Sequence, residues 1–253
     1  MAATDRIIEL DDNVKIKSGD VVIPGFFCRP AGGGPFPGLI LFHGTDGFQP
    51  THRKLAVDLA HEGYAVLVPE WFGPERPRRL SWEMVPPADL KAMGEWIKKQ
   101  PEVDDRRLGL MGASRGGGLA LYAASLIPGI RAVVNFFGLT CWSGGMEEFR
   151  RLPFNPGDHL DFLRRVSSPI LSFHGDRDTV VKVENTFMLD RTCRRFGLEH
   201  HRIIYPGVDH SFIWPGNPRY HRDAHRDSWE KTLAFLNRRL SFADRAEKRP
   251  ARP

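Results

Sequence analysis

One short motif constrains the fold of this chain more than any other feature: Gly-Ala-Ser-Arg-Gly at positions 112–116. An apolar run at 108–111 precedes it, and small and apolar residues at 117–125 follow it. This order predicts a buried strand, a sharp turn that carries Ser114, and a helix. The turn lifts the serine hydroxyl clear of the sheet while strand and helix crowd its flanks. Gly112 and Gly116 meet that demand because neither carries a Cβ atom.

The composition is that of an ordinary globular domain. The 253 residues are 41% apolar and 26% charged, which is enough for a large core. No window is long and apolar enough to span a membrane, and the first residues lack the segments of a secretory signal. The cysteines, Cys28, Cys141 and Cys193, are scattered and show no metal-binding spacing. We therefore expect a cytoplasmic protein with no membrane contact, no metal and no cofactor.

The net charge of +5 is modest, and arginines in the basic C-terminal part often stand beside acids, as in Asp176-Arg177-Asp178. A nucleic-acid-binding protein would carry a patch of one sign together with a recognisable motif. The sequence offers neither, so we expect a small molecule and no nucleic acid as the partner. A mild preference for anionic substrates stays open.

Strand and helix patterns alternate along most of the chain. Residues 7–30 alternate in polarity around Gly19-Asp20, which predicts an antiparallel hairpin. From Leu39 onward, apolar runs typical of fully buried strands take turns with helical patterns, the last of which is Asp223 to Leu240. The pattern predicts an α/β fold with a mostly parallel sheet, helices on both faces and an antiparallel N-terminal edge.

We expect a single domain over residues 1–240, because no linker or repeat interrupts this alternation. Residues 140–166 are irregular and are interpreted as a small cap over the site. Residues 241–253 are polar, end in proline and are interpreted as a flexible tail.

Ligands of parallel α/β sheets bind at the carboxyl ends of the strands, so the residues just after each predicted strand are the candidates for chemistry. Ser114, Asp178 and His210 each follow such a strand, in the chain order of an α/β-hydrolase triad. A serine hydroxyl is a weak nucleophile, so His210 would take its proton while a carboxylate orients the imidazole and stabilises its cation. The sequence therefore predicts an α/β-hydrolase fold with Ser114 at its nucleophile elbow.

Two aspartates compete for the role of the acid. Asp178 lies further into its loop and precedes an apolar pair, so it can turn back toward His210. Asp176 sits at the tight turn, where an aspartate more often accepts bonds from backbone amides. Asp209 adjoins His210, and sequence neighbours rarely place their side chains for this bond. We favour Asp178.

An oxyanion hole needs two backbone donors aimed at the developing negative oxygen. One is the N–H of Arg115 at the start of the predicted helix. The other comes from the loop after the first parallel strand, where we choose Thr45 over Gly44. His43, at the end of that strand, is interpreted as structural.

Aromatic residues near the strand ends could line an apolar pocket for the acyl group, although each could equally pack in the core or the cap. They are Phe48, Trp71, Phe72, Trp142, Phe212 and Trp214. Arg76, Arg78 and Arg79 stand in a loop at the same end of the sheet, where they could hold the phosphates of an acyl-CoA or face only solvent.

These motifs together resemble those of the dienelactone hydrolase family of α/β-hydrolases, from about Phe36 to Leu240. Besides the elbow, the resemblance rests on Pro35-Phe36-Pro37-Gly38, on residues 61–69 (His-Glu-Gly-Tyr-Ala-Val-Leu-Val-Pro), on 174–178 (His-Gly-Asp-Arg-Asp) and on 205–212 (Tyr-Pro-Gly-Val-Asp-His-Ser-Phe). The family's matching positions imply the same triad and the same two oxyanion donors.

The chain also departs from that family. Dienelactone hydrolases proper use a cysteine nucleophile, a glutamate in the first βα loop that regulates it, and an arginine after the histidine that grips the substrate carboxylate. Here Ser114, Gly44 and Trp214 look to occupy those places. We therefore do not expect dienelactone itself to be the substrate.

A second resemblance is to the catalytic domain of acyl-CoA thioesterases and bile-acid acyltransferases, through residues 35–38, Pro101-Glu102-Val103 and the elbow. The sequence thus predicts a serine hydrolase that cleaves small carboxylic esters or lactones through an acyl-enzyme. An acyl-CoA thioesterase is the alternative, and an inactive binding protein on the same fold is the alternative of another class. Monomer and homodimer both stay open.

Overall fold

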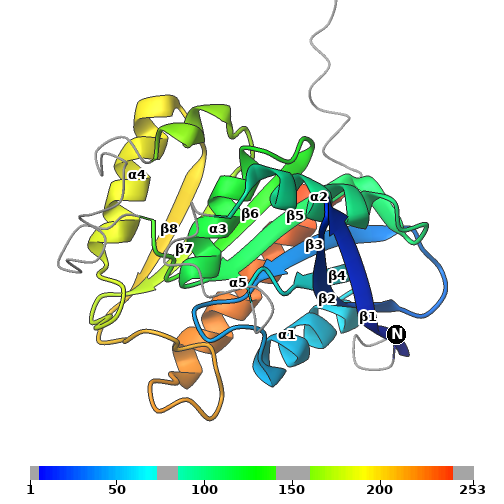
Figure 1. Cartoon of the computed structure of the whole chain (residues 1–253). Helices are drawn as coiled ribbons and strands as arrows, with labels where there is room; N and C mark the ends of the chain where they lie inside the picture. The colour runs from blue at the N-terminus through cyan, green and yellow to red at the C-terminus, as the bar shows by residue number, and fades with distance from the viewer. Residues whose placement is uncertain (1–5, 73–84, 141–159, 242–253) are drawn as a thin grey trace, which may run out of the picture.

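Eight strands form one sheet through the centre of the molecule, in the order β1-β2-β4-β3-β5-β6-β7-β8 (Figure 1). The structure is a computed structural model that describes residues 6–72, 85–140 and 160–241. The strands are β1 (Ile8–Ser18), β2 (Val21–Pro30), β3 (Phe36–Phe42), β4 (Ala65–Pro69), β5 (Val103–Ala113), β6 (Ile130–Phe136), β7 (Ile170–Gly175) and β8 (His200–Tyr205). The helices are α1 (Pro50–His61), α2 (Pro87–Lys98), α3 (Arg115–Ala124), α4 (Glu184–Phe196) and α5 (Arg222–Leu240).

The predicted fold class is confirmed. The strands β1 and β2 form an antiparallel hairpin around Gly19, which has a φ of +58°, and β2 pairs with β4 antiparallel. All further pairs, from β4–β3 to β7–β8, are parallel. The carboxyl ends of β3, β5, β6 and β7 therefore meet at one edge of the sheet, which is where the site must be sought.

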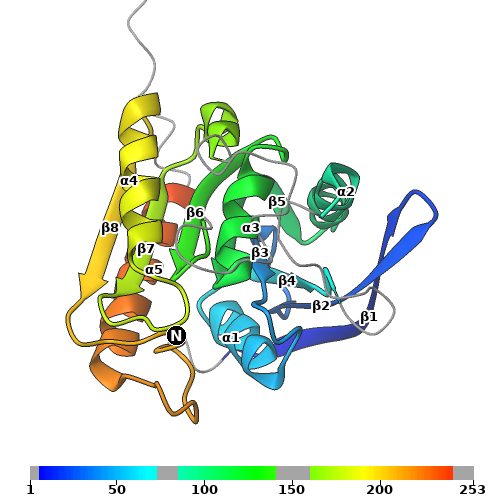
Figure 2. The ribbon, with the colours of Figure 1, turned by 60° about the vertical axis from the view of Figure 1, so that its left-hand side comes forward.

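Two apolar layers hold the helices to the sheet. Helices α2, α3 and α4 pack on one face, and α1 and α5 pack on the other (Figures 1 and 2). Strand β3 is apolar throughout because both of its faces are buried. Ile40 and Phe42 face the layer of α2, α3 and α4, while Leu39 and Leu41 face the layer of α1 and α5. A strand buried on both faces cannot alternate polar with apolar residues.

The last predicted helix, Asp223 to Leu240, agrees with α5 to within one residue. Helix α1 begins at Pro50. Proline suits the first helical position because a backbone N–H there would have no acceptor within the helix, so its absence costs no hydrogen bond. Gly197 ends α4 in the left-handed conformation, with a φ of +68°. Such stop signals are local, so the sequence carries them.

The predicted cap at 140–166 lies mostly outside the described residues; within it, Asp161–Arg165 forms a short 3₁₀ helix. Of the predicted tail at 241–253, only residue 241 belongs to the described residues. The division into a single domain stays a prediction. Across the described ranges, no helix combines the length and apolarity needed to cross a membrane. Cys28 and Cys193 are buried free thiols, and burial raises the pKa of each to about 12.

A buried polar cluster connects α4 to β7 and β8, the last two strands at one end of the sheet. His200 lies 2.9 Å through Nε2 from the Ser172 hydroxyl and 3.2 Å through Nδ1 from Asp190. Arg194 and Arg202 also bond the Asp190 carboxylate. Burial lowers the pKa of His200 to about 4, although Asp190 acts in the opposite direction.

We predict that His200 makes folding stability fall as pH drops from 7 to 5. In that window the unfolded chain protonates this histidine at its usual pKa of about 6.5, while the folded chain does not, so unfolding takes up a proton. The expected loss is about 2 kcal/mol of unfolding free energy. Urea denaturation at both pH values measures the total loss, and His200→Gln should reduce that total by this amount; buried His43 and His52, whose pKa values are also lowered, contribute their own share. The matched control is His201→Gln, since His201 is exposed and bonded to Glu199; an equal pH slope in both variants would contradict the assignment.

Candidate active site

Ser114 occupies a strained turn between β5 and α3, with a φ of 56° and a ψ of −123°. The two flanking glycines are required there by space. A Cβ atom on Gly112 would lie 2.0 Å from the Gly116 carbonyl oxygen, and one on Gly116 would lie 2.2 Å from the Phe42 carbonyl oxygen. The close approach that the sequence predicted is present, and the strain is of the kind that clusters at functional sites.

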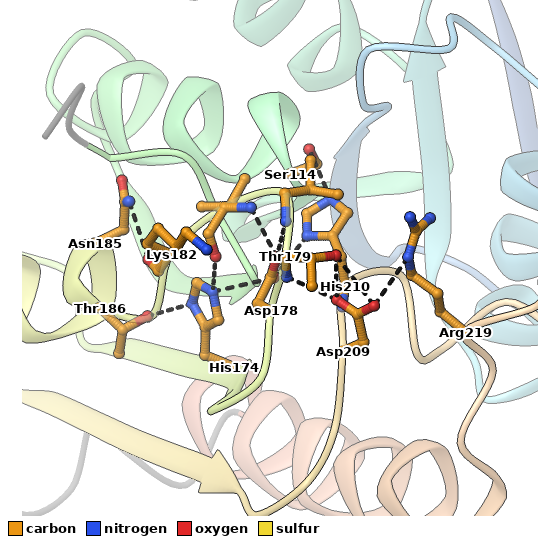
Figure 3. A network of polar contacts seen from close by, with 12 residues as sticks. Ser114, His174, Asp178, Thr179, Lys182, Asn185, Thr186, Asp209, His210 and Arg219 are labelled. Carbon is orange, nitrogen blue, oxygen red and sulfur yellow. Dashed lines mark hydrogen bonds and ion pairs between the residues drawn. The ribbon is translucent and has the colours of Figure 1, made fainter. Parts of the chain in front are cut away.

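Three side chains from three loops meet at this turn (Figure 3). His210 Nε2 lies 3.2 Å from Ser114 Oγ, and His210 Nδ1 lies 2.7 Å from Asp178 Oδ2. Because a carboxylate only accepts, Nδ1 must carry the proton of the neutral ring. Nε2 is then left as an acceptor for the Ser114 hydroxyl proton. The structure thus brings together the serine, histidine and acid that the sequence singled out.

Asp178 is the acid in contact with His210, and Asp176 is not. Asp178 is buried, and its Oδ1 accepts the backbone N–H groups of Val180 and Val181. Burial acts to raise the pKa of Asp178, but hydrogen bonds from His174 and His210 outweigh it and hold that pKa well below its usual range. Asp176 is exposed and accepts the backbone N–H of Gly207 instead.

A second histidine touches the same carboxylate, which the sequence reasoning did not anticipate. His174 is fully buried at the end of β7, and its Nε2 donates to the Val181 carbonyl oxygen 2.8 Å away and lies 3.2 Å from Asp178 Oδ2. Its Nδ1 accepts from the Thr186 hydroxyl (Figure 3). Asp178 therefore has histidine on both sides. The only sequence signal was the spacing of four residues between His174 and Asp178.

Asp209 joins the acid loop to the histidine loop. Its carboxylate accepts the backbone N–H of His210 and both the N–H and the hydroxyl of Thr179, and it pairs with Arg219 (Figure 3). Burial acts to raise the pKa of Asp209, but these bonds lower it. Asp209 thus links the backbone of His210 to the loop that carries Asp178, a connection that the sequence did not reveal.

The loop after β3 passes beside the serine. A Cβ atom on Gly44 would lie 3.4 Å from both the Ser114 Cβ and the Ala113 carbonyl oxygen. The Gly44 carbonyl oxygen accepts from His43 Nδ1 and from the Gly47 N–H. In a trans peptide the next N–H points the opposite way, so the Thr45 N–H is turned away from the His43 ring. No described residue accepts that N–H.

A cavity of about 660 Å³ opens over Ser114 and His210. Thr45 and Trp214 line it, together with polar groups from the start of α1 and from the loop after His210. Charged groups on its wall, within the described ranges, are Asp46 and Arg219. Within the described residues, no group of three or more His, Cys, Asp or Glu side chains is arranged so that it could hold a metal ion.

The predicted aromatic lining is corrected on most points. Trp214 lines the cavity, whereas Phe48 is half-buried and stacks on Phe26. Trp71, Phe72 and Phe212 belong to the core because each is turned inward. The Trp71 indole N–H donates to the His43 carbonyl oxygen, Phe72 packs against the His43 ring, and Phe212 packs between Phe137 and Tyr205. Trp142, Arg76, Arg78 and Arg79 lie outside the described residues.

Comparison with known proteins identifies the family of the chain. The model of the dienelactone hydrolase family matches residues 23–240. The chain belongs to the dienelactone hydrolase family. A Methylorubrum extorquens protein, provisionally named a carboxymethylenebutenolidase, is 27% identical over 90% of this chain and 81% of its own length.

Two further likenesses bear on the fold and on the alternative activity. A structure of a provisionally named dienelactone hydrolase from Klebsiella pneumoniae superposes with a TM-score of 0.76 over 91% of this chain and 98% of the other, at 23% identity. Human acyl-coenzyme A thioesterase 1 is 24% identical over 86% of this chain and 63% of its own length. The family assigns the chain to the hydrolases of carboxylic esters and lactones.

We predict that Asp209→Ala lowers kcat/KM for a p-nitrophenyl ester by about 10- to 100-fold, because loops displaced by about 1 Å lose catalytic alignment. The variant loses the bonds that hold His210 beside the acid loop. Asp227→Ala is the matched control, since Asp227 is an α5 carboxylate that bonds Tyr205 of β8 and Lys231 of α5 instead of the loops of the site. Equal turnover by the two variants would show that Asp209 does not position His210.

Proposed function

We propose that the chain is a serine esterase or lactonase in which Ser114 is the nucleophile, His210 the general base and acid, and Asp178 the residue that orients His210. The observation that carries this proposal is the continuous chain of contacts from Asp178 through His210 to the Ser114 hydroxyl, at the floor of a cavity. Nucleophile, base and orienting acid are the parts that acyl transfer requires.

In the first half-reaction, Ser114 Oγ bonds to the carbonyl carbon of the ester, and its proton moves to His210 Nε2. The carbonyl π electrons move onto oxygen and return as the bond to the leaving group breaks. His210 then gives its proton to the departing alkoxide. The Asp178 carboxylate stabilises the imidazolium that exists between these transfers.

In the second half-reaction, a water molecule attacks the acyl-enzyme and His210 takes the proton of the water. Collapse of the second tetrahedral intermediate breaks the bond to Ser114 Oγ, which recovers its proton from His210. The carboxylic acid leaves, and both side chains return to their starting protonation states.

The negative oxygen of both intermediates is bound by two backbone donors, the N–H groups of Thr45 and Arg115. Arg115 is the first residue of α3, so its amide also lies at the positive end of the helix dipole. The assignment of the Thr45 N–H as a donor is supported by the hydrogen bonds from His43 Nδ1 and the Gly47 N–H to the Gly44 carbonyl oxygen, because these bonds orient the peptide group that carries the Thr45 N–H. His43 acts as a positioning residue in this arrangement.

An acyl-CoA thioesterase is the second candidate, favoured by the human thioesterase relative that this chain matches over 86% of its length. The same triad chemistry serves a thioester, with a thiolate as the leaving group.

We propose a cytoplasmic enzyme, because Cys28 and Cys193 are buried free thiols and a reducing environment suits free thiols. We propose a small-molecule substrate and either a monomer or a homodimer.

Ser114→Ala should lower turnover of short p-nitrophenyl esters by about 10⁴-fold or more, because the nucleophile is removed. A fluorophosphonate probe should label wild-type protein, and neither Ser114→Ala nor His210→Ala should be labelled. Undiminished turnover in Ser114→Ala would exclude the mechanism. Absence of labelling and turnover in folded wild-type protein would favour a binding protein. Parallel assays with an ester and an acyl-CoA of equal chain length separate esterase from thioesterase.

Separate substitution of the two competing aspartates tests which of them orients His210. Asp178→Asn should lower kcat by about 10³- to 10⁴-fold, because the amide N–H would donate to His210 Nδ1 and force the ring proton onto Nε2. Asp176→Asn is the matched control and should stay close to wild type. Thermal denaturation of both variants verifies folding. A larger loss in Asp176→Asn would reverse the assignment.

A further inference from the structure

One polar group in the cavity wall is used by none of the steps above. His52 lies in the first turn of α1 and lines the cavity that holds Ser114, with only 6% of its surface exposed. Its Nδ1 has a partner, but its Nε2 has none among the described residues. Nε2 is not among the fully enclosed unpaired atoms of the described residues, so it is accessible from the cavity that His52 lines, and an accessible, unpaired nitrogen there can bind a ligand.

The hydrogen bond at Nδ1 decides where the ring proton lies. The Gln49 backbone N–H donates to His52 Nδ1 across 3.1 Å. An Nδ1 that accepts cannot carry a proton, so the neutral ring has its proton on Nε2. Protonation of the ring would break this bond at the start of α1. Burial also lowers the pKa of His52 to about 4, against the opposing charge of Asp46. His52 therefore presents an uncharged N–H donor to the cavity.

Two neighbouring rings fix the direction of that donor. His52 packs edge-on against Trp214, with ring centroids 5.0 Å apart, and edge-on against His43, at 5.9 Å. Trp214 lines the same cavity, and His43 immediately precedes the loop that carries Thr45. A ring held on two sides and bonded at Nδ1 has little freedom to turn, so its N–H is preorganised for a ligand oxygen.

The charges around His52 select the kind of oxygen. Asp46 lines the cavity near His52, and its negative charge acts on the ring. Among the described residues of the wall, the positive group is Arg219, and it is paired with Asp209. A substrate carboxylate at His52 would meet Asp46 without a compensating charge on the imidazole. A neutral carbonyl oxygen accepts the N–H without that repulsion.

We propose that His52 Nε2–H binds a second, uncharged carbonyl oxygen of the substrate, in addition to the carbonyl that Ser114 attacks. This inference rests on the proposed function and narrows its substrate class to esters or lactones that carry a further ketone, ester or amide carbonyl. A site built to donate to an oxygen rejects an analogue that lacks the oxygen, because the buried donor is then left unpaired.

Matched pairs of esters test the proposal. The p-nitrophenyl esters of 4-oxopentanoate and pentanoate differ only in one carbonyl, and those of 5-oxohexanoate and hexanoate move that carbonyl by one carbon. Wild-type protein should prefer the oxo ester of at least one pair by about tenfold in kcat/KM. The preference should be constant from pH 6 to 9, because the donor is a neutral ring.

Variants of His52 separate recognition from folding. His52→Phe keeps an aromatic ring against Trp214 and should reduce the oxo preference to about one, while hydrolysis of the alkyl esters persists. His52→Gln offers both an acceptor for the Gln49 N–H and a donor for the substrate, so it should retain part of the preference. Thr51→Val, at the adjacent cavity-lining position, is the matched control and should keep the full preference.

A binding measurement keeps this inference apart from the proposed catalysis. Ser114→Ala protein, titrated with the same esters, should bind the oxo ester more tightly, and Ser114→Ala with His52→Phe should not. Preferential binding without wild-type turnover would overturn the proposed function and leave the His52 site standing. Turnover with equal kcat/KM for oxo and alkyl esters, or a preference that survives in His52→Phe, would overturn the His52 site alone.

Discussion

The arrangement of the site depends on how closely the first turn of α3 approaches the carboxyl ends of β3 and β5. Gly112 and Gly116 allow backbone contact there, and a Cβ atom on either would lie within about 2 Å of a carbonyl oxygen. The helix can therefore start directly at Ser114, in a conformation that few residues adopt. The same approach brings the Gly44–Thr45 peptide beside the serine. A larger residue at either glycine would separate the hydroxyl from the loop that faces it.

The sequence could predict the residues whose positions follow from topology. Ser114, Asp178 and His210 each end a strand or follow one closely, and parallel strands end at one edge of the sheet, so their meeting follows from the alternation of strands and helices. Asp176 could be separated from Asp178 because its place in the tight turn commits it to a backbone amide. These inferences require only the order of the strands and helices along the chain. They do not require knowledge of how the side chains pack.

The residues that the sequence could not place depend on which way a side chain turns. Trp71 and Phe212 lie near strand ends as expected, but bonds and ring contacts inside the core turn them away from the cavity. His174 and His52 gain their roles from contacts with Asp178 and with the Gln49 N–H. The histidine spacing was visible, yet the direction of each ring depends on how α1 and β7 pack against their neighbours.

A second set of the same residue types shows that contact geometry alone does not make such a site. Ser172, His200 and Asp190 lie within hydrogen-bond reach of one another, much as Ser114, His210 and Asp178 do. Ser172 is fully buried within strand β7 and has regular backbone geometry, and no described cavity reaches it. Its hydroxyl has no space for a carbonyl carbon, so the array ties α4 to the sheet.

The charges around the two aspartates separate the sets further. Arg194 and Arg202 both bond Asp190, so its negative charge is already shared with two guanidinium groups before His200 is protonated. Among the described residues, the side chains that contact Asp178 are histidines, and its remaining bonds come from backbone amides. Its charge therefore stays available to the imidazolium that the proposed acyl transfer would form on His210. Of the two arrays, only the one with an uncompensated carboxylate, a strained serine and an open cavity has the parts that the chemistry requires.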